Sequence, residues 1–244
     1  MKARRIIGFF ALFLGGLLAS VALADDHIVR ELTRTYMGRT TPPRPSEVWM
    51  GEDKICIKEG VVIIITRYDL KKRWTIIVPQ KKYLEEDLGA PSGPMPQEEK
   101  PFRIQEYGFN YEPSYNWTIK KAAETETIDG RKCRKIVAQG DADYAEEVRE
   151  MWVSEDVPIN FKRYYDLVTK PNLDAQWLKI YEGTPELKSG LVVKSVYTSE
   201  PPIAPTIVMV NKLVKAEIAP PPPNIYEVPE GMQKVKTMEE LYAR

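Results

Sequence analysis

The side chains that could do chemistry are few in this sequence and poorly placed for catalysis. Its 244 residues include a single histidine, His27. A lone imidazole cannot build a metal site of several histidines, and no glycine-rich phosphate loop accompanies it. Neighbouring acids, as in Glu85-Glu86-Asp87, point to different faces of a strand or helix and not across a cleft. We therefore predict no catalytic residue, no metal site and no cofactor, and we expect His27 to lie in a mobile N-terminal segment.

Aromatic side chains are the strongest candidates for binding. The chain has five tryptophans and 13 tyrosines. Such rings either fill a large core or line an apolar pocket whose polar rim holds the head of a ligand, and both interpretations stay open here. The predicted ligand-binding residues are those expected on one hollow face of a sheet, together with three further tryptophans: Ile63, Ile65, Trp74, Ile76, Trp117, Trp152 and Trp177.

The first 24 residues predict export. Lys2, Arg4 and Arg5 form a basic start, Ile6 to Leu18 is apolar and uncharged, and Ala22-Leu23-Ala24 offers small side chains to a peptidase. These are the three parts of a secretory signal peptide. The alternative is an uncleaved anchor, because Ile6 to Ala24 carries no charge and its 19 residues come close to the roughly 20 that span a bilayer. We predict a signal peptide over residues 1–24 and a soluble periplasmic protein after cleavage, with no integral membrane span.

The predicted periplasmic location affects how the net charge and the two cysteines are interpreted. Cleavage would leave a net charge of −3, because three of the 35 basic residues and none of the 35 acidic ones lie in the signal. A mildly acidic chain argues against nucleic acid as a partner. In an oxidising compartment Cys56 and Cys133 could form a disulfide. The alternative is two separate buried thiols, because both cysteines lie in strand-like runs.

The elements that must position these residues are mostly strands. From Ile28 to Pro79 short β-branched and aromatic runs alternate with turn residues, which predicts an antiparallel meander. Asp129-Gly130 between two further runs is a strong hairpin signal. Apolar residues at helical spacing predict two helices over 159–168 and 173–181 that lie on the sheet.

Four further segments interrupt or follow the predicted strands. Lys82 to Leu88 could form one or two helical turns, and the proline-rich stretch from Gly89 to Pro101 reads as an exposed loop. Prolines 220–223 predict a stiff extended spacer, and Met238 to Ala243 a short helix. The strands on either side of the loop look alike, so we predict one domain over residues 25–244.

Several short motifs carry a resemblance to a known group of proteins. They occur in the order Arg67-Tyr68-Asp69, Lys71-Lys72-Arg73-Trp74, Pro79, Lys82-Tyr83, Asp129-Gly130-Arg131-Lys132-Cys133, Met151-Trp152-Val153-Ser154 and Val228-Pro229-Glu230-Gly231. Together they resemble an uncharacterised family of exported bacterial proteins that is similar to the LolA and LolB lipoprotein carriers. The resemblance implies an α+β fold, mainly antiparallel β, in which a strongly curved, unclosed β-barrel has helices covering its concave face and can hold acyl chains. The proline-rich loop and the missing lipid-acceptor cysteine depart from that pattern.

The sequence thus predicts a non-enzymatic periplasmic protein that binds an apolar ligand, such as a lipid or a lipoprotein acyl chain. The alternative is an interaction or sensing module of the envelope, with a pocket filled by its own side chains and a protein partner. A hydrolase of unknown type is the third hypothesis.

Overall fold

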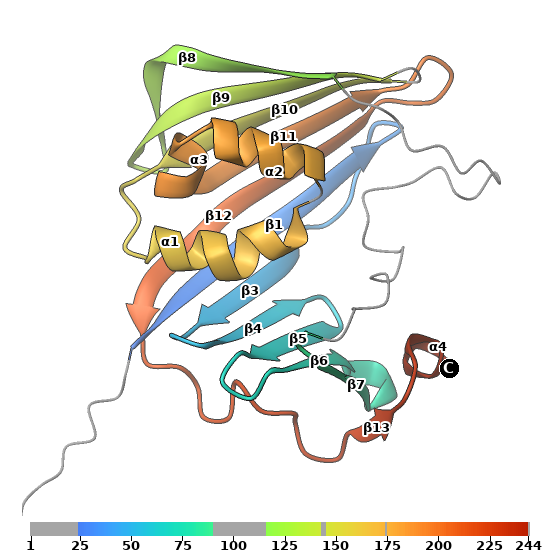
Figure 1. Cartoon of the computed structure of the whole chain (residues 1–244). Coiled ribbons are helices and arrows are strands. Elements are labelled where there is room, and N and C mark those ends of the chain that lie inside the picture. The colour runs from blue at the N-terminus through green and yellow to red at the C-terminus, as the bar shows by residue number, and fades with distance from the viewer. Residues whose placement is uncertain (1–23, 90–115, 143–144, 174, 244) are drawn as a thin grey trace, which may run out of the picture.

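A computed structural model describes residues 24–89, 116–142, 145–173 and 175–243, and its strands join one sheet (Figure 1). The sheet has 13 strands, in the order β13-β7-β6-β5-β4-β3-β1-β12-β11-β10-β9-β8, with β2 paired to β1. The strands are β1 Asp25–Tyr36, β2 Arg39–Thr40, β3 Arg44–Met50, β4 Lys54–Glu59, β5 Val62–Arg67, β6 Lys72–Ile77, β7 Lys82–Asp87, β8 Asn116–Ile128, β9 Arg131–Ala142, β10 Ala145–Ser154, β11 Leu191–Glu200, β12 Ile207–Ala219 and β13 Gln233–Val235.

The sheet is curved and does not close, as predicted. Its end strands β13 and β8 do not pair with each other, and β13 pairs with β7 in parallel while the other pairs are antiparallel. The Asp129-Gly130 hairpin is confirmed: both residues have positive φ, 48° and 78°, between β8 and β9. The helical turn expected at Lys82 to Leu88 is wrong. That segment is strand β7, because it pairs along its whole length with β6 and packs Leu84 into a core cluster.

The two predicted helices lie between β10 and β11. The first is α1 (Phe161–Tyr164), extended by a π-helical turn η4 (Tyr165–Thr169) and a 3₁₀ turn η5 (Lys170–Asn172). The second is α2 (Ala175–Gly183), followed by α3 (Glu186–Ser189), while η1 (Val78–Gln80) and α4 (Met238–Tyr242) lie elsewhere. The side chain of Asn160 caps α1 by accepting the backbone N–H of Arg163. In the described part of the chain, no helix combines the length and apolarity needed to cross a membrane.

Strand alternation gives the sheet two differently covered faces. On the helix face, Ile55 of β4 shares a core cluster with Tyr164 and Val168 of the α1–η4 helix. Trp177 and Ile180 of α2 pack on the same sheet farther along, against strands β9 and β10. In Figure 1, α1, α2 and α3 lie over the β8–β12 and β1 part of the sheet.

On the opposite face, the part of the sheet formed by β3 to β7 is covered by the chain's own C-terminal segment. We call residues 220–232 the strap and the surface beneath them the strap face. Tyr226 of the strap shares a core cluster with Cys56, Ile65 and Trp74. Beyond the strap, β13 pairs with β7, and α4 buries Leu241 beside Ile77 and Leu84. Because Ile77 follows Ile76 of the strap face, α4 packs on the other side of the sheet. The predicted stiff spacer is therefore the start of a structural element.

The two cysteines are separate thiols and do not form the disulfide that was one of the two predicted alternatives. Both are buried and unpaired. Cys56 lies on β4 in the strap-face cluster, whereas Cys133 lies on β9 in another cluster, with β3, β1, β12, β11 and β10 between the two strands. Strands are spaced by roughly 4.8 Å, and a disulfide needs Cα atoms within about 7 Å of each other. Burial raises the pKa of the Cys56 thiol to about 11.

The remaining sequence predictions fall largely outside the described residues. Residues 1–23 of the predicted signal peptide and residues 90–101 of the predicted loop belong to the segments that are not described. The signal peptide, the loop and the single-domain boundary therefore stay predictions.

Candidate functional site

The residues predicted to bind a ligand do not come together in one place. Four of them share the strap-face cluster: Ile63, Ile65, Trp74 and Ile76. The indole of Trp152 lies beneath the ammonium groups of Lys135 and Lys194, and its Nε1 donates to Glu126 at 2.8 Å. Trp117 and Trp177 form a separate pair, with ring centroids 4.9 Å apart.

The strap face holds one lateral row of side chains that crosses seven neighbouring strands. Strand register places in this row Glu217, His27, Trp49, Cys56, Ile65, Trp74 and Glu85. Trp49 donates its Nε1 hydrogen to Glu47 at 2.7 Å, and Trp74 donates to Glu85 at 3.0 Å. The strap packs over the apolar middle of the row. The four residues expected on a hollow, helix-covered face thus lie on the opposite face, under the strap.

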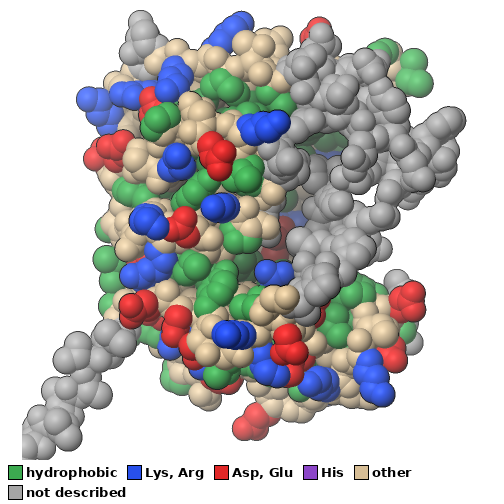
Figure 2. Space-filling model, viewed as in Figure 1, with side chains coloured by type: hydrophobic (Ala, Val, Ile, Leu, Met, Phe, Trp, Pro, Cys, Tyr) green, Lys and Arg blue, Asp and Glu red, His purple; other side chains and the backbone are tan. Residues whose placement is uncertain are grey.

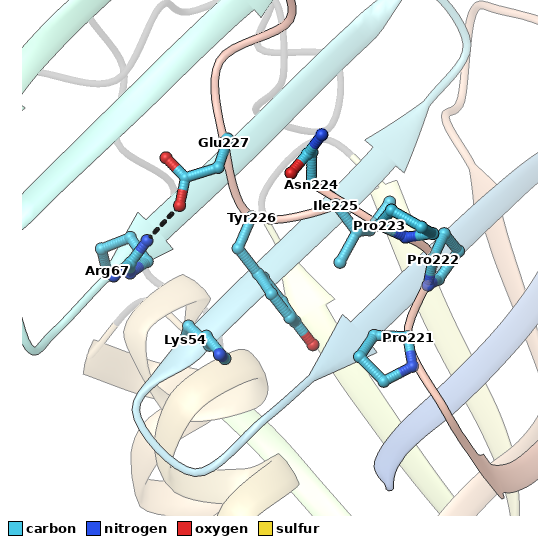
Figure 3. Close-up of a pocket in the computed structure, with 9 residues that line it drawn as sticks. All are labelled: Lys54, Arg67, Pro221, Pro222, Pro223, Asn224, Ile225, Tyr226 and Glu227. Carbon is cyan, nitrogen blue, oxygen red and sulfur yellow. Dashed lines mark hydrogen bonds and ion pairs between the residues drawn. The ribbon is translucent and has the colours of Figure 1, made fainter. Parts of the chain in front are cut away.

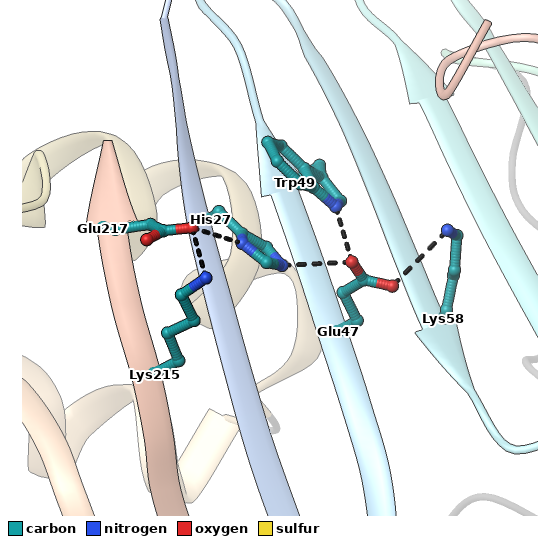
Figure 4. A network of polar contacts seen from close by, with 6 residues as sticks. All are labelled: His27, Glu47, Trp49, Lys58, Lys215 and Glu217. Atoms are coloured by element: carbon teal, nitrogen blue, oxygen red, sulfur yellow. Dashed lines mark hydrogen bonds and ion pairs between the residues drawn. The ribbon is translucent and has the colours of Figure 1, made fainter. Parts of the chain in front are cut away.

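His27 was expected in a mobile segment, and that expectation is wrong. It is 8% exposed on β1 in the middle of the sheet, with its ring stacked on Trp49 at 4.0 Å and 10° (Figure 4). Its Nε2 lies 3.0 Å from Glu47 Oε1 and its Nδ1 lies 3.2 Å from Glu217 Oε1. Both ring nitrogens are thus engaged by carboxylates of the chain itself. A general base needs a nitrogen within reach of the substrate, and neither pocket lining described below includes His27.

The two carboxylates beside His27 are held in their charged form. Burial opposes ionisation of Glu47, but hydrogen bonds from Trp49, Lys58 and His27 outweigh it and lower its pKa. Hydrogen bonds from Lys215 and His27 lower the pKa of Glu217. Ion pairs and hydrogen bonds of this network therefore join β12, β1, β3 and β4 (Figure 4).

A pocket of about 350 Å³ lies where the strap meets the sheet (Figure 3). Its lining includes Lys54, Arg67 and Tyr226. The Tyr226 hydroxyl donates to Asp25 at 2.6 Å, and the Lys54 ammonium lies 4.9 Å from the Tyr226 ring centroid. Arg67 makes ion pairs with Asp69 and Glu227, both at 2.6 Å. The polar ends of Lys54, Arg67 and Tyr226 are therefore already engaged with other residues of the chain, which favours a structural role.

A second pocket lies between the edge strand β8 and helix α2. We call it the β8–α2 groove; it has a volume of about 410 Å³ and is lined by Trp117, Ile119, Lys121, Lys179, Ile180, Gly183 and Thr184. Trp117, Ile119 and Lys121 alternate along β8, so their side chains share one face. On α2 the lining residues follow helical spacing, and the helix ends at Gly183. The groove therefore lies between the sheet and one of its covering helices.

A glycine on the neighbouring strand shapes the wall of this groove. A Cβ atom added to Gly140 would lie 3.0 Å from three carbons of the Trp117 ring. Residue 140 pairs directly with residue 117, so the absence of a side chain there lets the indole lie against β9. Sequence reasoning selected Trp117 but missed Ile119, Ile180 and Gly140. The alternation in Trp117-Thr118-Ile119 was the available signal.

The rim of the groove is basic. Lys121 Nζ lies 2.7 Å from Glu186 Oε2, and Arg134 Nη1 lies 3.0 Å from the other oxygen of the same carboxylate. The hydrogen bond from Lys121 is the largest cause of the lowered pKa of Glu186. Lys179 is exposed and has no ion pair with a carboxylate among the described residues. The groove therefore combines apolar walls with excess positive charge at its edge.

Within the described ranges, no three His, Cys, Asp or Glu side chains come together as a metal site.

Comparison with known proteins gives distant likenesses only. No family model matches the chain, and no curated protein matches it. Among solved structures, PNGF-II is 10% identical with a TM-score of 0.38, and the match covers 89% of this chain but only 32% of PNGF-II. The chain thus spans about a third of the length of that protein.

Two further structures cover more of their own length. A DUF1329 family protein from Desulfovibrio piger is 12% identical with a TM-score of 0.30, over 85% of this chain and 90% of the other. A LolA superfamily protein from Nitrosomonas europaea is 10% identical with a TM-score of 0.29, over 84% of this chain and 90% of the other. The matches thus include the LolA superfamily, to which the sequence resemblance pointed. At these TM-scores we draw no functional conclusion from them, and we base the proposal below on the residues of this chain.

Proposed function

We propose that this protein is a non-enzymatic, periplasmic binding protein that holds the apolar chain of a lipid or lipoprotein in the β8–α2 groove. The observation that carries the proposal is the groove itself, with Trp117, Ile119 and Ile180 as apolar walls between a sheet strand and a covering helix. Its volume of about 410 Å³ falls within the range of roughly 300–1,000 Å³ that is usual for small-ligand sites. The export-like N-terminal sequence supports the location.

The energetics of such binding follow from buried hydrocarbon. Each methylene group removed from water contributes about 0.8 kcal/mol, which multiplies the affinity by roughly four. A groove that shields only part of the chain gains less per methylene. We also propose that the helix face is the concave side of the sheet. The ligand would then lie on the side where a LolA-like carrier holds an acyl chain.

The packed strap face favours a second candidate, an envelope interaction module. There the apolar row of Trp49, Ile65 and Trp74 is already covered by Tyr226 and its neighbours. A protein of this kind would need no lipid, and it would meet a protein partner through its surface.

Binding of a fluorescent fatty-acid analogue to delipidated protein tests the proposal. We expect saturable fluorescence that unlabelled dodecanoate displaces, and a loss of at least ten-fold in affinity for Ile119→Glu, because a carboxylate would enter the apolar wall. The matched control is Ile203→Glu, since Ile203 is fully exposed and is not part of the groove lining. Absence of displaceable binding, or equal loss in both variants, contradicts acyl-chain binding in this groove and favours the interaction module.

A further inference from the structure

The charges at the groove point to a particular class of ligand. Lys121 reaches the groove from β8 and Lys179 from α2, so the two walls each contribute a cation. Glu186 is the acidic group that contacts this rim, and it is shared between Lys121 and Arg134. Glu182 is exposed on α2, but it is absent from the groove lining. One carboxylate shared by two cations leaves Lys121, Arg134 and Lys179 with a net positive charge.

We propose that the β8–α2 groove selects single-chain amphiphiles with an anionic head, with the hydrocarbon against Trp117, Ile119 and Ile180 and the head between Lys121 and Lys179. This inference rests on the proposed function, because it names the ligand class for the same groove. One strand and one helix line the open groove, and its volume is about 410 Å³, so we commit the inference to a single hydrocarbon chain. Lysine ammonium groups on flexible stems can follow heads of different shapes, so the site selects by charge.

The size of the effect follows from the exposure of the two lysines. An ion pair at an exposed site contributes up to about 1 kcal/mol, which is roughly a five-fold change in affinity. Two such contacts therefore predict that an anionic amphiphile binds about five- to twenty-fold more tightly than a neutral one of equal chain length. Salt should weaken this preference, because screening acts over about 10 Å at 0.1 M ionic strength.

A displacement assay with three ligands of equal chain length tests the inference. Dodecanoate, dodecanol and dodecyltrimethylammonium compete against a neutral fluorescent alkyl probe, each below its critical micelle concentration. We expect dodecanoate to bind most tightly and the ammonium compound least tightly. The Lys121→Gln, Lys179→Gln double variant should lose the preference for the anion while it keeps dodecanol affinity. The matched control is Lys170→Gln, because Lys170 is exposed and lies outside the groove lining.

Charge reversal gives the sharpest readout, because Lys179→Glu should raise affinity for dodecyltrimethylammonium relative to dodecanoate. The outcomes separate the two proposals. Equal binding of dodecanoate and dodecanol by the wild type, or an unchanged preference in the double variant, overturns the inference and leaves acyl-chain binding intact. Failure of all three ligands to displace the probe overturns both.

Discussion

Replacement of Tyr226 by Phe tests how the strap is fastened to the sheet. The Tyr226 hydroxyl donates to Asp25 Oδ2 at 2.6 Å, and the two residues are 6% exposed each. A hydrogen bond to a charged group contributes about 1.5–3 kcal/mol, and its loss leaves the buried carboxylate short of a partner. The phenyl ring of the variant keeps the packing against Cys56 and Trp74. We therefore expect Tyr226→Phe to lower the free energy of unfolding by about 2 kcal/mol.

Urea denaturation followed by tryptophan fluorescence measures this change. For a chain of this size the same loss would lower the melting temperature by about 4–8 °C. Tyr36→Phe is the matched control, because Tyr36 is 41% exposed on β1, and it should change stability by less than about 0.5 kcal/mol. In a double-mutant cycle, Asp25→Ala and Tyr226→Phe should be coupled by at least about 1 kcal/mol. Two results would refute the idea that this hydrogen bond holds the strap on the sheet. One is additive effects of the two substitutions, and the other is a decrease in unfolding free energy for Tyr226→Phe no larger than that for Tyr36→Phe.

Three further predictions concern stability and thiol chemistry. Gly190→Ala should lower the free energy of unfolding by about 2 kcal/mol or more, because the added Cβ would lie 2.9 Å from the backbone oxygen of Ser154 on β10. Gly183→Ala is the control and should leave stability unchanged, because nothing lies within 4 Å of its added Cβ. Equal melting temperatures of the two variants would contradict this prediction. Protein purified without reductant should show two free thiols per chain, Cys56 and Cys133, when titrated in denaturant, and no free thiol would indicate a disulfide between them. The hydrogen bonds from Lys72 and Trp74 lower the pKa of Glu85 from 4.5 to about 2, so its contribution to stability is present above pH 4.5 and is lost on acidification toward pH 2. The stability gap between wild type and Glu85→Gln should therefore narrow over that range, and a constant gap would contradict the ion-pair origin.

Local signals predicted much of the fold. The Asp129-Gly130 turn needs positive φ at both residues, which is a property of the dipeptide and was readable from the sequence. Tyr164 and Val168 lie on one stripe of the α1–η4 helix and share a core cluster, as their spacing predicted. Ile159 joins the same cluster, but it lies before the N-cap Asn160, so the helix begins later than predicted. The meander between β3 and β7 follows from consecutive runs that pair with their immediate neighbours.

Long-range pairing accounts for what was missed. His27 is ordered because β1 lies between β3 and β12, which brings Glu217 to a residue 190 positions away. The strand β7 is held by β6 on one side and by β13, far along the chain, on the other. Nothing near Ile65 in the sequence tells whether it faces the helices or the strap, because both faces of β5 carry apolar residues.

The candidate site shows the same limit. Trp117 and Trp177 were selected by type, and the structure brings them together from β8 and α2. Ile180 joins them because α2 packs against β9 and β10. The residue pattern of one segment cannot predict this groove, because its two walls come from β8 and α2, which are far apart in the sequence.

Quenching of tryptophan fluorescence by a spin-labelled fatty acid tests acyl binding in the β8–α2 groove most directly. A nitroxide on the bound chain quenches rings near it, so Trp117 and Trp177 should be quenched, while Trp49 and Trp74 lie on the strap face and should not. We predict that the Trp117→Phe, Trp177→Phe double variant still binds the fatty acid in the displacement assay but loses most of the quenching. Undiminished quenching in a double variant that still binds would place the chain elsewhere and contradict the account.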